Sequence, residues 1–155
     1  FYKTRSNEQV AIDTTNNLFI IRVTGSSGQI FSIYKLTDIK NSSVDYIDGN
    51  IPKLATFTIP KTPLDFQGFD IAGDYVYVYY GESNRNGTQN SQGYVAMYDF
   101  LGNEKFNKKV YSTSTSIFEE PEGIKVYKES GKYAAYLGSS LVSGSQKYVK
   151  ICTFK

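Results

Sequence analysis

Carboxylates are the residues of this sequence with the clearest chemical potential, and Glu119, Glu120 and Glu122 stand within one short stretch. Such a cluster could bind a cation, or supply one of the paired acids that cleave a glycosidic bond. A glycosidase needs a second carboxylate across its site, and the candidates are Asp13 and Asp70. The structural alternative, which we favour, is that Glu122 accepts backbone N–H bonds and anchors its own loop.

An amide-rich segment, residues 82–93, is the second candidate. Its amides, Asn86 among them, could hydrogen-bond sugar hydroxyls or phosphate, with Arg85 as the contact for an anion. Tyr80 and Tyr94 flank the segment, where an aromatic ring could stack on a sugar. The alternative interpretation is an ordinary solvated loop.

Two further patterns favour structural roles. Tyrosine and valine alternate over residues 75–80, which predicts a strand that packs between two layers of a core. A basic run, Lys105, Lys108 and Lys109, could attract a polyanion but more often protects the edge of a sheet.

Several classes of chemistry are excluded by composition. The chain has no histidine, so Ser-His-Asp and Cys-His catalysis and His-ligated zinc are ruled out. Its one cysteine, Cys152, lies in an apolar strand pattern and is predicted to be buried. A net charge of +2 does not indicate nucleic acid, and no apolar run is long enough for a membrane helix. We expect no metal, no cofactor and no membrane or nucleic-acid partner.

An internal repeat dominates the sequence. The string Gln67-Gly68-Phe69-Asp70-Ile71 returns about 55 residues later as Glu122-Gly123-Ile124-Lys125-Val126. Residues 94–100 return in the same way at 148–154, and a more diverged copy begins at Gln9. Each copy predicts a strand, a tight turn, a second strand, a longer loop and a third strand. Poorer fourth strands are predicted at 54–59 and 106–112, and the third copy is predicted to turn at 127–132.

This recurrence predicts an all-β fold made of β-propeller blades, in one domain with repeat units at about 9–60, 67–112 and 122–155. A sandwich or barrel is the alternative. A propeller needs about 4–8 blades, so three units leave two open apolar flanks. The abrupt start in a strand-like segment at residues 1–5 favours a part of a longer chain, although companion chains could also complete the ring.

Two strings carry a resemblance to a known family. Residues 66–71 with 73–79, and the string Glu120-Pro121-Glu122-Gly123-Ile124, resemble helveticin-type class III bacteriocins. They also resemble the five-bladed propeller platform in receptor-binding proteins of phages of Gram-positive bacteria. The resemblance extends over about 64–155, and implies that these are the C-terminal three of five blades. It further implies binding to cell-wall glycopolymers, notably teichoic acids, by a virion or secreted protein.

We therefore expect a non-enzymatic module that recognises a cell-wall glycan, with avidity from repeated copies in a trimer or on a virion. A propeller glycosidase or teichoic-acid hydrolase that uses Glu120, Glu122 and Asp70, and a purely structural platform, remain alternatives. Binding residues should lie where the first strand of each unit starts and where its second and third strands connect. The residues expected to contact ligand are Gln67, Asp70, Tyr80, Arg85, Asn86, Tyr94, Glu120 and Glu122.

Overall fold

Three antiparallel sheets make up the described part of the chain. The structure, a computed structural model, describes residues 8–44, 47, 49–83, 90–112 and 118–154. The first sheet contains β1 (Gln9–Asp13), β2 (Leu18–Thr24), β3 (Gly28–Lys35) and β4 (Ala55–Pro60). The second contains β5 (Asp65–Ala72), β6 (Tyr75–Glu82), β7 (Gln92–Asp99) and β8 (Glu104–Ser112), and the third contains β9 (Phe118–Glu129), β10 (Lys132–Ser143) and β11 (Gln146–Phe154).

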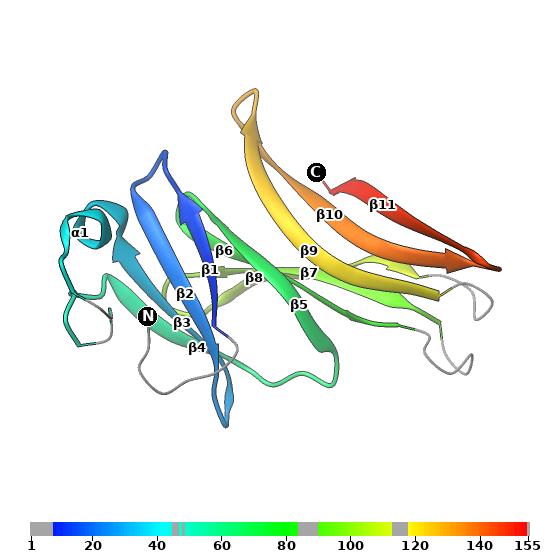
Figure 1. Ribbon diagram of the computed structural model, residues 1–155, viewed down its shortest axis with the longest axis horizontal. Helices are drawn as coiled ribbons and strands as arrows, with labels where there is room; N and C mark the ends of the chain where they lie inside the picture. Colours follow the sequence, from blue (N-terminus) through cyan, green and yellow to red (C-terminus); the bar gives the residue numbers. More distant parts are fainter. Residues whose placement is uncertain (1–7, 45–46, 48, 84–89, 113–117, 155) are drawn as a thin grey trace.

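The sheets follow one another like blades around an axis (Figure 1). Each sheet is an up-and-down meander, and its first strand lies innermost: β5 packs beside both β1 and β9. The all-β, blade-like fold is therefore confirmed, and so are the fourth strands of the first two units. No helix among the described residues is long and apolar enough to span a membrane.

The second sheet is buried on both faces, as the alternation in β6 predicts. Val76 and Val78 face the first sheet, whereas Tyr77 and Tyr79 face the third. Between the first and second sheets, the ring of Phe31 meets the edge of Phe69 at a centroid distance of 5.2 Å. β-Branched and aromatic side chains suit a pleated surface that is packed on both sides, which explains why these residues form strands.

One short helix, α1 (Leu36–Asn41), was not expected from the sequence. Together with Ile47 and Ile51 it covers the outer face of β2 and β3, where Phe19 and Ile21 are buried. Figure 1 shows α1 on the side of the first sheet that faces away from the second. The prediction of two open apolar flanks was therefore wrong for the middle strands of the first sheet, β2 and β3, because the β3–β4 connection covers them.

Three other expectations were wrong in detail. The turn expected at 127–132 is confined to Ser130 and Gly131, because β9 continues to Glu129. β5 and β9 also begin earlier than expected, at Asp65 and Phe118. Cys152 is exposed rather than buried, because β11 is the edge strand of the third sheet, which has three strands in the described residues.

Candidate functional site

A β-bulge recurs at the same place in two inner strands. In the β5–β6 ladder Phe66 pairs with Tyr80 and Gly68 with Tyr79, so Gln67 is the extra residue. In the β9–β10 ladder Pro121 and Gly123 are paired in the same way, so Glu122 is the extra residue. Bulges occur often beside functional sites, where they re-aim a side chain. In the second and third sheets, the repeat therefore leaves one polar residue of the inner strand outside the ladder.

These two bulges open into one cavity with a volume of about 310 Å³. Gln9, Gln67 and Glu122, which occupy equivalent positions in the three units, all line it. We call it the bulge cavity; its other lining residues are Val10, Gly68, Phe69, Gly123 and Ile124. The starts of the three inner strands therefore lie beside one cavity.

Asp70, the residue after Phe69 on β5, contacts the third sheet. It is 2% exposed. Its Oδ2 accepts the backbone N–H of Val126 at 2.7 Å, and the Lys125 ammonium lies 3.1 Å from Oδ1 and 3.0 Å from Oδ2. Both oxygens are thus occupied by the neighbouring sheet, and Asp70 is not among the residues that line the bulge cavity.

The three neighbouring glutamates separate into different environments. Glu119 is buried, and both its oxygens accept hydrogen bonds from Lys150 at 3.1 and 3.2 Å. Glu120 is half-buried, whereas Glu122 is exposed at the bulge. Within the described part of the chain, no group of three His, Cys, Asp or Glu side chains is arranged to hold a metal ion. The sequence grouped Glu119 with the other two glutamates and did not predict its burial or its contact with Lys150, because a strand that begins at Phe118 could not be distinguished from a loop.

The tyrosines beside the amide-rich segment differ in accessibility. Tyr80 is 5% exposed and belongs to the core between the first and second sheets, where its ring stacks on Tyr94 at 6.0 Å. Tyr94 is only partly buried, and the Lys109 ammonium lies 5.3 Å from its ring centroid. Of the pair, Tyr94 is therefore the one with surface to offer a ligand. Arg85 and Asn86 lie outside the described residues.

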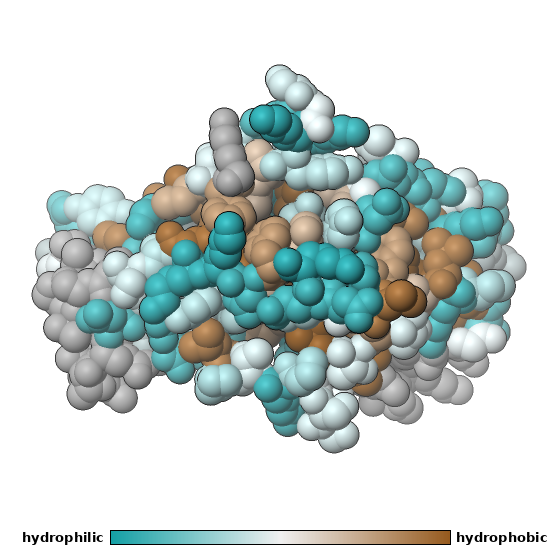
Figure 2. Space-filling view, turned by 180° about the vertical axis from the view of Figure 1, so that it is seen from behind, coloured by the Kyte–Doolittle hydropathy of each residue, from teal (hydrophilic) through white to brown (hydrophobic). Residues whose placement is uncertain are grey.

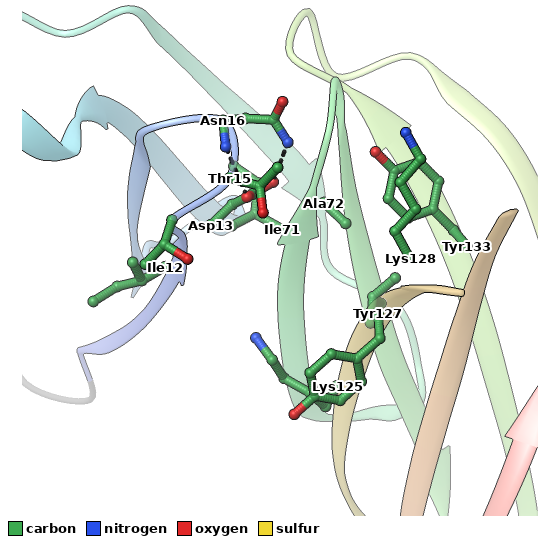
Figure 3. Close-up of a pocket in the computed structure, with 12 residues that line it drawn as sticks. Ile12, Asp13, Thr15, Asn16, Ile71, Ala72, Lys125, Tyr127, Lys128 and Tyr133 are labelled. Carbon is green, nitrogen blue, oxygen red and sulfur yellow. Dashed lines mark hydrogen bonds between the residues drawn. The ribbon is translucent and has the colours of Figure 1, made fainter. Parts of the chain in front are cut away.

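A second cavity, of about 230 Å³, lies near the other ends of the inner strands (Figure 3). One wall is the β1–β2 turn with Asp13, Thr15 and Asn16, and the other is β9 with Tyr127 and Lys128. The Asp13 carboxylate accepts hydrogen bonds from the backbone and side chain of Asn16 at 3.0 and 2.7 Å. It also accepts the N–H of Gly73 at 3.0 Å, so it ties the first sheet to the second, as Asp70 ties the second to the third.

The Asp13 contacts predict a pH dependence of stability. Partial burial opposes ionisation, but the hydrogen bonds from Asn16, Gly73 and Thr15 outweigh it and lower the pKa of Asp13. A lowered carboxyl pKa stabilises the fold above the unfolded value of about 3.9, and the contribution is lost as pH falls through the folded pKa. We expect Asp13→Asn to lower the melting temperature at pH 7, with the difference from wild type shrinking below about pH 4. Melting curves from pH 7 to pH 2 test this, with Asp38→Asn on exposed α1 as the control, and a pH-independent difference would contradict it.

Comparison with known proteins gives the family. Residues 4–152 match the model of the phage five-bladed β-propeller receptor-binding platform domain. The chain belongs to this family. No curated protein matches its sequence. Among solved structures, the tail fibre of Staphylococcus aureus phage P68 superposes on 94% of the platform chain with a TM-score of 0.69 at 21% identity. The platform chain spans 28% of the length of that tail fibre.

Proposed function

We propose that this platform domain takes part in host recognition on the virion by binding a cell-wall glycopolymer of the teichoic-acid type, without cleaving it. The bulge cavity carries the proposal, because the same bulge in two repeat units aims Gln67 and Glu122 into one concave site. The match to a receptor-binding family and the structural similarity to a phage tail fibre favour a protein of the virion over a secreted bacteriocin.

The chemistry of the bulge cavity suits a polyol or sugar. Glutamine amides both donate and accept hydrogen bonds, and the Glu122 carboxylate accepts them, so hydroxyl groups find complementary partners. A negative phosphate would be repelled by Glu122, so we assign hydroxyls of the polymer to the cavity. The polymer's phosphates would instead be drawn to exposed lysines such as Lys108 and Lys109 on β8. Each site should bind weakly, and repeated copies on a trimeric fibre or virion would raise the affinity by avidity.

The hydrolase alternative receives no support from the geometry. It needs two carboxylates that face one substrate bond. Glu122 is the one carboxylate among the described residues that line the bulge cavity, and both oxygens of Asp70 are held by the third sheet.

Binding to purified cell walls tests the proposal. We expect Gln67→Ala and Glu122→Gln each to weaken binding by up to about tenfold, since each removes or alters a hydrogen bond to ligand. Asp74→Asn is the matched control, because Asp74 is an exposed acid at the β5–β6 turn, away from the cavity. Unchanged binding in both cavity variants would refute the site. Release of soluble polymer by the wild type, abolished in Glu122→Gln, would favour the hydrolase.

A further inference from the structure

The second cavity, near the other ends of the inner strands, differs in charge from the bulge cavity. Glu122 is the one charged side chain among the described residues that line the bulge cavity. The second cavity, of about 230 Å³, is lined by two lysines, Lys125 and Lys128, and by one carboxylate, that of Asp13. Two ammonium groups against one carboxylate favour a ligand that carries a negative charge.

The β9 wall of the second cavity combines its cations with aromatic rings. The Lys125 ammonium lies 5.7 Å from the ring centroid of Tyr127, and the Lys128 ammonium lies 5.8 Å from that of Tyr133. At such distances the ring attracts the ammonium, so each lysine is held beside a tyrosine. Tyr127 is 53% exposed and therefore keeps ring surface for a ligand. A ring beside an ammonium suits a sugar that carries a negative group.

The two lysines are not equivalent. The Lys125 ammonium lies 3.1 and 3.0 Å from the two oxygens of buried Asp70, which fix its position. An ammonium has three N–H donors, so Lys125 can still donate one hydrogen bond to a ligand. Lys128 is exposed and pairs with no carboxylate of the described residues. An anionic group should therefore bind nearest to Lys128, with Lys125 as a second donor.

The opposite wall, at the β1–β2 turn, suits hydroxyl groups (Figure 3). Thr15 and Asn16 are exposed there, and their side chains can both donate and accept hydrogen bonds. The Asp13 carboxylate is held in place by donors from Asn16 and Gly73. Its negative charge repels an anionic group and attracts hydroxyl donors. A ligand in this cavity is therefore oriented with its anionic group toward β9 and its hydroxyls toward the turn.

We propose that the second cavity binds one sugar or polyol unit that carries a phosphate or a carboxylate. Its ring lies against Tyr127, and its anionic group is bound by Lys128 and Lys125. A volume of about 230 Å³ is below the roughly 300–1,000 Å³ of pockets for drug-sized ligands, so a single unit fits better than a chain. The second cavity shares no lining residue with the bulge cavity, and its ligand does not depend on the glycan binding proposed there.

Saturation-transfer NMR on the whole receptor-binding polypeptide tests this proposal, because the method detects weak ligands of large proteins. The probes are glucose 6-phosphate, glucuronate, glucose and inorganic phosphate. We expect at least one of the two anionic sugars to bind roughly tenfold more tightly than glucose and than inorganic phosphate, since it alone uses both walls. Lys128→Gln should remove most of this advantage, whereas Lys128→Arg should keep it. Tyr127→Ala should weaken binding of the anionic sugar roughly tenfold.

Matched controls are Lys40→Gln on exposed α1 and Tyr148→Ala on β11, where Tyr148 is 48% exposed. Neither residue lines the second cavity, and both variants should bind the probes as wild type does. Equal binding of glucose and both anionic sugars would overturn the proposal, and so would an effect of Lys128→Gln no larger than that of Lys40→Gln. Inorganic phosphate that binds as tightly as the anionic sugars would show a plain anion site and overturn the assignment to a sugar.

The two proposed sites can fail independently. Binding of single units is measured at Lys128 and Tyr127, whereas binding of the cell-wall glycan is measured at Gln67 and Glu122. Loss of one effect with retention of the other identifies which cavity has been assigned wrongly.

Discussion

Phe31→Ala should destabilise the protein by about 4 kcal/mol, the range expected when a buried aromatic ring is removed from a core. Phe31 is fully buried in β3 at the centre of the joint between the first and second sheets. Its ring stacks on Phe57 and meets the edge of Phe69, each at 5.2 Å between centroids. The substitution would leave a void between two sheets that share one core, so both should loosen together.

Chemical denaturation followed by circular dichroism measures this effect. Leu101→Ala is the control because Leu101 is 83% exposed, and its free energy of unfolding should stay within about 0.5 kcal/mol of wild type. Phe31→Leu should lie between the two, since it keeps most of the apolar volume. A loss below about 1 kcal/mol for Phe31→Ala would mean that the first sheet contributes little to the cooperative unit.

Asp70→Ala is expected to cost about 3 kcal/mol, because a buried charge-assisted hydrogen bond is lost and its donor is left without a partner. The variant removes the acceptor of the Val126 N–H and the counter-ion of Lys125. Lys125 is 46% exposed and can turn to water, so the buried N–H dominates the loss. The second and third sheets should separate more readily as a result.

Hydrogen exchange resolves where the Asp70→Ala effect falls. Protection of the β9 amides should decrease by more than that of the β2 and β3 amides, which lie across the other joint. Asp65→Ala is the matched control, since Asp65 is an exposed acid on the same strand. Equal loss of protection in all three sheets would indicate that Asp70 stabilises the molecule globally rather than one joint.

The repeat made much of this fold predictable from sequence. The recurrence of Gln67-Gly68 as Glu122-Gly123 located two inner strands, and the alternation from Tyr75 to Tyr80 correctly predicted a strand packed on both faces. The bulges were not predicted, because a polar residue before glycine at the start of a strand also suits a loop. Their significance required the register, which places both extra residues at one cavity.

The misses have a common physical cause, namely neighbours that are remote in sequence. Leu36 and Ile39 give too short a periodic pattern to indicate a helix, and α1 is stabilised mainly by its packing on Phe19 and Ile21. Glu119 is buried because Lys150 of β11 reaches it. The residues next to Cys152 in the sequence are mostly apolar, but β11 is the edge strand of the third sheet among the described residues, and Cys152 is exposed there.

Figure 2 shows hydrophobic patches between bands of hydrophilic side chains on the face opposite that of Figure 1.

A glycine determines how closely the inner strands of the second and third sheets approach each other. A Cβ on Gly68 would lie 3.2 Å from the Cα of Gly123, so the backbones of β5 and β9 are nearly as close as they can be. A side chain at position 68 would require the two inner strands to move apart slightly, whereas a Cβ on Gly123 would meet nothing within 4 Å. The close approach of the second and third sheets at their inner strands therefore depends on the lack of a side chain at Gly68.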